Sequence, residues 1–157
     1  MARLAVLLIL SVTLILPTLA SSAPDRDHAV TGAGVLDDGT VFQVNAHTAF
    51  GDVPGMVRLT RPGAAGVVEI TLECLAVSWH QPVYPIPPYL PFHLAEASGI
   101  DNDGVRHYVT IYDLVIRPVG FGDRMILSTE GGSGACGTTG INDIGRPLAT
   151  GDITITP

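Results

Sequence analysis

The sequence has no lysine, only two cysteines and a single tryptophan among its 157 residues. Its 8 basic residues are all arginines and stand against 15 acidic ones, giving a formal net charge of -7 at pH 7. The phosphates of nucleic acids and anionic membranes would repel so acidic a chain, so we expect neither as a partner. Several catalytic and metal-binding patterns are missing too: no CxxC, HxH, HExxH or GxSxG occurs. We therefore expect no metal, no cofactor and no catalytic residue.

The first residues have the composition of a secretory leader. A single arginine precedes an apolar run from Leu4 to Leu16, and a proline and small residues follow it. That run is shorter than the roughly 20 residues that cross a bilayer, so a cleaved peptide is favoured over a membrane anchor. We place cleavage after Ala20, with Ala23 as the second choice. Because no cysteine lies near either site, lipid anchoring is not expected, and the mature chain should be secreted and extracellular.

The mature chain reads as one β-domain without a long helix. Residues 21–30 are polar and should form a flexible terminus, and residues 31–157 should form the domain. Alternating apolar residues separated by turn signals, such as Asp-Asp-Gly at 37–39 and Pro-Gly at 62–63, predict about eight mainly antiparallel strands. Strands are expected at 31–36, 40–50, 55–61, 67–79, 92–98, 105–116, 124–129 and 149–157. Such a pattern is typical of a sandwich or a barrel, and we leave these two open.

The segment 67–79 is the longest of these strands and carries Cys74. Ile70, Leu72 and Cys74 share one side of an extended backbone, so we expect the Cys74 thiol to point into the core. Beyond Cys74 apolar residues fall on both sides, which predicts a distal end covered on both faces. The other cysteine, Cys136, should form a disulfide with it, because an oxidising compartment leaves no spare thiol. The bond would close a loop of about 62 residues, worth ~4 kcal/mol at most.

The ordered set of short motifs resembles a known family. DDGTVFQVNA, PGMVRL, YVTIYDLVI followed by GFGDRMIL, and a terminal LATGDITI together are similar to the post-COAP domain of secreted bacterial proteins. The likeness covers roughly residues 31–155. It implies a small exported β-domain and transfers no catalytic residue. The separation of Asp113 from Asp123, the proline-rich loop at 80–91 and the cysteine pair depart from the family pattern.

Aromatic residues in and around the proline-rich loop give the best candidate binding surface. Trp79, Tyr84, Tyr89 and Phe92 could offer flat rings to a sugar or a protein partner at the cell exterior. The alternative is that the loop folds over the long strand and uses these rings to seal the core.

The remaining candidate sites have simpler explanations. Asp101, Asn102, Asp103 and Gly104 begin like a calcium loop, but the rest of an EF-hand is missing. A hairpin turn is therefore the favoured explanation, with calcium binding as the alternative. His80 and His93 flank the proline-rich loop and could approach each other. The other histidines, at 28, 47 and 107, occur singly.

Three functions remain in view. The first is a secreted non-enzymatic module that binds a partner or ligand through the aromatic surface. The alternative is a small extracellular hydrolase, using the carboxylates of Glu69 and Glu73 or the hydroxyl of Ser133. The third is a structural component of the cell envelope.

Overall fold

The computed structural model describes residues 27–48, 52–53, 55–80, 91–115, 122–138 and 145–156. These residues form eight strands and one short 3-10 helix. The predicted leader, residues 21–26 and residues 81–90 of the proline-rich loop lie outside them. In chain order the elements are β1 (Ala29–Leu36), β2 (Val41–His47), β3 (Gly55–Thr60), β4 (Val68–His80), β5 (Phe92–Asp101), β6 (Arg106–Leu114), β7 (Arg124–Ser128), η1 (Ala135–Gly137) and β8 (Arg146–Thr156).

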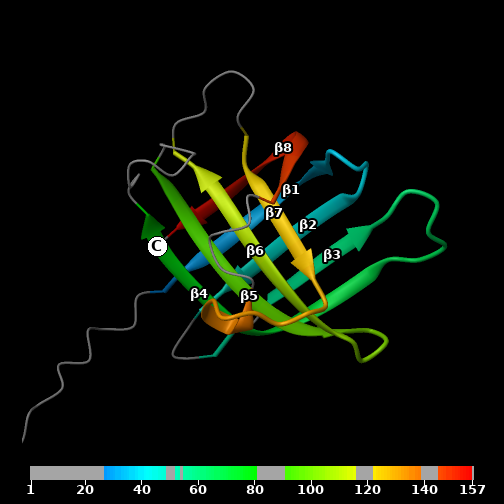
Figure 1. Ribbon diagram of the computed structural model, residues 1–157, viewed down its shortest axis with the longest axis horizontal. Coiled ribbons are helices and arrows are strands. Elements are labelled where there is room, and N and C mark those ends of the chain that lie inside the picture. Colours follow the sequence, from blue (N-terminus) through cyan, green and yellow to red (C-terminus); the bar gives the residue numbers. More distant parts are fainter. Residues whose placement is uncertain are drawn as a thin grey trace, which may run out of the picture.

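The strands close into a barrel in which each strand pairs with its neighbour in sequence and β8 returns to β1 (Figure 1). All of these pairings are antiparallel. The all-β prediction is therefore confirmed, and of the two open architectures the barrel is the one formed. We name the two ends by what lies there. The hairpin end carries the β1–β2 and β5–β6 turns, and the terminus end is where β1 begins and β8 ends.

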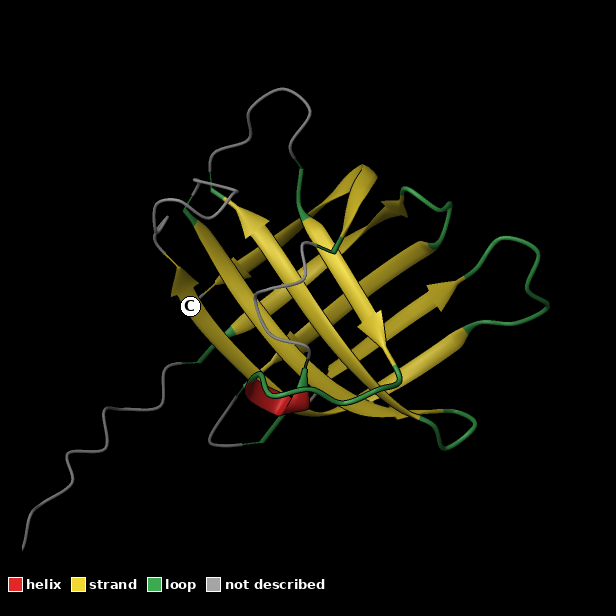
Figure 2. Cartoon of the chain, viewed as in Figure 1, coloured by secondary structure: helices red, strands yellow, loops and turns green. Residues whose placement is uncertain are grey.

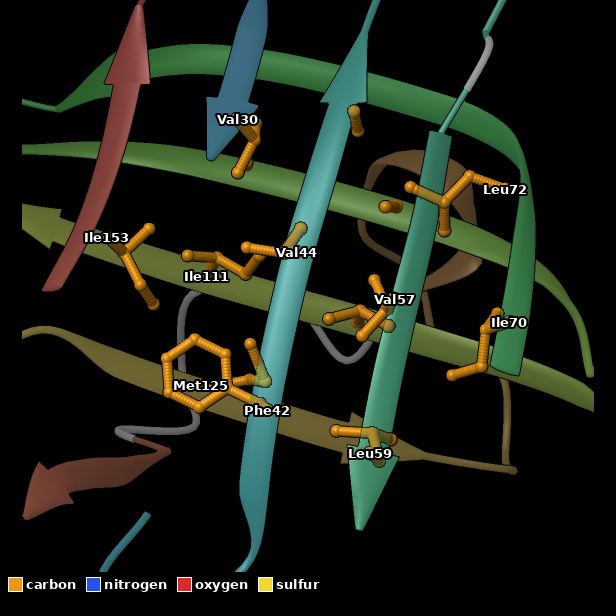
Figure 3. Packing of buried hydrophobic residues seen from close by; sticks show 14 of the residues in the cluster. Val30, Phe42, Val44, Val57, Leu59, Ile70, Leu72, Ile111, Met125 and Ile153 are labelled. Atoms are coloured by element: carbon orange, nitrogen blue, oxygen red, sulfur yellow. The ribbon is translucent and has the colours of Figure 1, made fainter. Parts of the chain in front are cut away.

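The interior of the barrel is packed with apolar side chains. Along β2, Phe42, Val44 and Ala46 are buried while Gln43, Asn45 and His47 are exposed, the period-two alternation that the sequence predicts. Each large side chain buried in this way contributes roughly 1.5–3 kcal/mol. Side chains from strands around the barrel meet in its centre (Figure 3), among them Val30, Phe42, Val44, Val57, Leu59, Ile70, Leu72, Ile111, Met125 and Ile153.

A β-bulge in β4 places the Cys74 side chain on the face opposite to the one expected. Leu72 pairs with Gly99 and Cys74 with Ser98, so Glu73 is the extra residue and the alternation shifts by one. Leu75 and Val77 consequently pack against the core. Cys74 lies on the outer face of the barrel, and the prediction that its sulfur points into the core is wrong. The predicted double covering of the distal strand is also wrong, because Trp79 at its end is 44% exposed.

The disulfide itself is confirmed. Cys74 and Cys136 are bonded with their Cα atoms 5.7 Å apart. The bond ties residues 129–138, which we call the strap, to the outer face of the barrel. Within the strap, the N–H of Gly132 donates to the carbonyl of Gly137 at 2.7 Å, and the N–H of Gly134 donates to that of Thr138 at 2.9 Å. Figure 2 shows η1, the helical turn of the strap, as the short red helix beside the strands.

The strap buries a polar patch on the outside of β5 and β6. Glu96, Ser98 and Thr110 are 8%, 4% and 1% exposed, although all three lie on the outer face. The Thr138 hydroxyl, which is fully buried, donates to the Glu96 carboxylate. The ring of Tyr108 lies so close to Gly131 and Gly137 that a Cβ at either glycine would stand 3.0 or 2.9 Å from it. Glycine at these strap positions therefore permits the close approach.

Two carboxylates close the barrel where β7 is too short to do so. In the described part of the chain β7 pairs with β8 at only two positions, Arg124 with Pro147 and Met125 with Arg146. Further along β8, the buried Asp123 carboxylate accepts from the N–H of Ile153 at 2.9 Å, and Asp113 accepts from that of Ile155 at 2.9 Å. Side-chain oxygens thus replace the missing strand partner of β8.

Candidate functional site

Trp79 stands at the terminus end of the barrel in a row of three facing side chains. Register pairs Trp79 with His93 on β5, and His93 with Asp113 on β6. The centroids of the Trp79 and His93 rings are 4.7 Å apart, and His93 Nδ1 is 3.8 Å from Asp113 Oδ2. A rigid strand rather than a loop therefore positions this exposed indole, with an imidazole and a carboxylate next to it.

Phe92 belongs to the other face of the same hairpin. Adjacent residues alternate between the faces of a strand, so Phe92 points away from the side that carries His93. The Phe92 ring stacks on the His80 ring, with centroids 5.2 Å apart. It also packs at a tilt against the Tyr112 ring, with centroids 5.5 Å apart. In the described part of the chain, the predicted aromatic surface is thus divided between two faces. Tyr84 and Tyr89 lie outside the described residues.

The segment that begins like a calcium loop is a hairpin turn between β5 and β6. The Asp101 carboxylate accepts from the backbone N–H groups of Asp103 and Val105 at 2.9 and 2.8 Å, and it lies 2.8 Å from Nε2 of His107. Gly104 has the positive φ of 82° that such a turn requires. No group of three or more His, Cys, Asp or Glu side chains among the described residues is placed to hold a metal ion.

The Asp101–His107 pair is almost completely buried, with side chains 7% and 6% exposed. The hydrogen bond with His107, assisted by the two backbone N–H groups, holds the pKa of the Asp101 carboxyl below its usual range, against an opposing effect of burial. A carboxyl whose pKa is lower in the folded state stabilises the protein above its unfolded pKa. That stabilisation disappears as the pH falls through the folded pKa.

We therefore expect Asp101→Asn to weaken the fold at neutral pH and to reduce the loss of stability in acid. Urea unfolding of both proteins between pH 7 and pH 2 measures the effect, and the two stability curves should converge at the acidic end. Asp103→Asn is the matched control, because it makes the same charge change in the same turn. Curves for wild type and Asp101→Asn that run parallel across this range would contradict the assignment.

The carboxylates considered for hydrolysis are engaged in ion pairs on the outer surface. Glu69 lies 2.8 Å from Arg58 and Glu73 lies 2.8 Å from Arg106, and all four side chains are about half exposed. Ser133 is exposed on the strap. In the described part of the chain, neither Glu69 nor Glu73 is hydrogen-bonded to Ser133.

Two hollows were not predicted from the sequence. One, of about 420 Å³, lies on the outer face of β2, β3 and β4 and is lined by Gln43, Asn45, His47, Gly55, Met56, Arg58 and Thr71. The other, of about 770 Å³, lies at the hairpin end, and we call it the mouth pocket. Its lining includes apolar residues at the base (Leu36, Leu59, Met125 and Leu127) and charged residues at the rim (Asp37, Asp38, Arg61 and Arg146).

The charged rim of the mouth pocket is partly neutralised. Arg146 Nη1 lies 3.5 Å from Asp37 and 3.4 Å from Asp38. The backbone N–H of Thr40 donates to Asp38 at 2.9 Å and, together with Arg146, lowers the pKa of that carboxyl. Arg61 has no ion pair with any described residue. No sequence signal joins these positions, because they come from segments far apart in the chain.

Comparisons with known proteins found no match to this chain among family models, curated proteins or solved structures. Among the described residues, no helix has the length and apolar character needed to span a membrane.

Proposed function

We propose that the protein works outside the cell as a non-enzymatic binding module, and that Trp79 at the terminus end of the barrel is its main contact residue. The observation that carries this proposal is an indole left 44% exposed on a rigid strand. Residues that serve only packing are usually buried, and tryptophan is enriched among the residues that dominate binding energy. The partner is a protein or a carbohydrate of the cell exterior.

The surroundings of Trp79 support recognition. The tilted contact with the His93 ring limits the motion of the indole, so little side-chain entropy is lost when a ligand binds to it. The nearby imidazole and the Asp113 carboxylate provide polar groups beside an apolar face. The leader-like sequence and the disulfide both fit an extracellular setting. Membership of the post-COAP family remains a prediction from the sequence.

The experiment is capture on glycan and peptide arrays, comparing wild type with Trp79→Ala. We expect capture to fall by at least about tenfold, with the melting temperature nearly unchanged because Trp79 is already 44% exposed. Val41→Ala is the control, since Val41 is an apolar side chain of β2 that is 50% exposed at the other end of the barrel. Undiminished capture by Trp79→Ala would contradict the proposal. A large fall in melting temperature would instead support a packing role in a structural protein.

A further inference from the structure

We propose that the mouth pocket binds a small hydroxylated carboxylate, such as a hexuronic acid, and that Arg61 binds its carboxylate group. This site is separate from Trp79, which lies at the opposite end of the barrel, and it does not depend on the function proposed above.

The position and size of the mouth pocket suit a small molecule. Ligand sites of β-barrels commonly lie at the mouth and enclose about 300–1,000 Å³, and this pocket measures about 770 Å³. It lies beside the corner at which β7 and β8 separate after two paired positions. Among the described residues, β7 has no pairing with β8 beyond Met125, and the pocket is lined there by β7 and the β1–β2 turn.

The rim carries two carboxylates and two guanidiniums, so its formal charge is zero. Both carboxylates lie within 3.5 Å of Arg146, which leaves the Arg61 guanidinium for a ligand carboxylate. Arg61 is the rim cation without an ion pair to a described residue. A guanidinium binds a carboxylate through two parallel hydrogen bonds, which fixes the orientation of the ligand as well as its charge. Asp37 and Asp38 would repel a second negative charge, so a phosphate dianion fits less well.

The rest of the lining favours a ligand that is polar at its edges. The carboxylates of Asp37 and Asp38 can accept hydrogen bonds from ligand hydroxyls, and Leu36 and Leu127 provide an apolar surface below them. A hexuronate has one carboxylate, several hydroxyls and a ring face of C–H groups. Each of these features therefore has a counterpart in the pocket.

The test is a titration of the purified, isotope-labelled protein with glucuronate, followed by NMR chemical shifts. For a ligand of about a dozen heavy atoms we expect a Kd on the order of 1 mM. Shifts should concentrate at Leu36, Leu59 and Leu127 and leave the indole N–H of Trp79 unmoved. Glucose, which lacks the carboxylate, and acetate, which lacks the hydroxyls, should each bind at least about tenfold more weakly. Equal binding of glucose or acetate overturns the proposal.

Arg61→Gln and Arg58→Gln form the matched pair of variants. Both remove one positive charge from an exposed arginine, but Arg58 lines the outer hollow on β2, β3 and β4. Arg61→Gln should weaken glucuronate binding by about tenfold or more, whereas Arg58→Gln should leave it within about twofold. The proposal is wrong if wild type shows no shifts at about 20 mM glucuronate, twenty times the expected Kd, if Arg61→Gln binds normally, or if shifts gather at Trp79.

A hexuronate can be a free acid or a residue of a polysaccharide. Comparing glucuronate with a linear trimer of hexuronates distinguishes these two sources. Tighter binding of the trimer supports a polysaccharide source, and equal or weaker binding supports the free acid. Loss of the trimer's affinity in Arg61→Gln is expected in both cases.

Discussion

Asp123→Ala is expected to destabilise the protein by about 4 kcal/mol, because it leaves two backbone N–H groups without their acceptor. Asp123 is 2% exposed. Its carboxylate accepts hydrogen bonds from the backbone N–H groups of Leu114 at 3.1 Å and of Ile153 at 2.9 Å. These donors belong to β6 and β8, so one side chain holds together the two strands that the short β7 does not join along this stretch. Such a loss is a large part of the roughly 5–15 kcal/mol that stabilises a typical domain.

Urea unfolding at pH 7 measures this effect. Asp123→Asn should be intermediate, since its amide keeps one acceptor oxygen and replaces the other with a donor. Asp103→Ala serves as the control, because it removes a carboxylate from the exposed β5–β6 turn and should cost little. A loss below about 1 kcal/mol for Asp123→Ala, no more than that of an ordinary neutral hydrogen bond, would show that barrel closure does not depend on this carboxylate.

Removal of the disulfide by Cys74→Ala together with Cys136→Ala should cost about 2–4 kcal/mol. The bond joins residues 62 apart in sequence, so without it the unfolded chain gains considerable freedom. Because the core of the barrel does not include either sulfur, the double variant should still fold. Its melting temperature should fall by about 10 °C, as expected for a domain of this size.

The structural effect of losing the disulfide should be confined to the strap. Hydrogen exchange should accelerate at the amides of Gly132, Gly134 and Thr138, while the amides of β2 and β3 keep their order of protection. Movement of the strap away from the barrel should also expose the polar patch that contains Glu96. Unchanged protection of the strap amides in the double variant would mean that hydrogen bonds alone keep the strap in place. Wild type treated with a thiol reductant provides an independent comparison.

The alternation of apolar residues was sufficient to predict the strands and the all-β class. Inward positions repeat at every second residue in β2, as at Phe42 and Val44, and in the last part of β8, at Ile153 and Ile155. Some strand ends differ: β1 begins at Ala29 rather than Thr31, and β8 begins at Arg146 rather than Ala149. Closure into a barrel could not be predicted, because it depends on side-chain acceptors between strands rather than on a sequence pattern.

The direction of Cys74 could not be predicted because Leu72-Glu73-Cys74 reads as unbroken alternation. The bulge at Glu73 depends on the partner strand. There Gly99 lies so close to β4 that a Cβ would stand 2.1 Å from the carbonyl oxygen of Thr71. The cysteine pairing itself was accessible, because two thiols in an exported chain leave a single choice.

Trp79 was named from the sequence as a candidate contact residue because it adjoins the proline-rich loop, with core packing as the alternative. Its 44% exposure was not predicted. Trp79 and Phe92 lie on different faces because β4 and β5 pair Trp79 with His93 rather than with Phe92. The sequence does not specify this register, because a loop separates the two strands. The mouth pocket was missed because Arg61, Asp38 and Arg146 meet only after three separate segments of the chain come together.

Accessibility of Trp79 to water is the most direct test of the proposed recognition role. Trp79 is the only tryptophan in the sequence, so intrinsic fluorescence reports on this residue alone. We predict emission typical of a partly hydrated indole, readily quenched by acrylamide in the folded protein. Blue-shifted emission that acrylamide does not quench would mean that Trp79 is sealed within the fold, and the proposed binding surface would then be wrong.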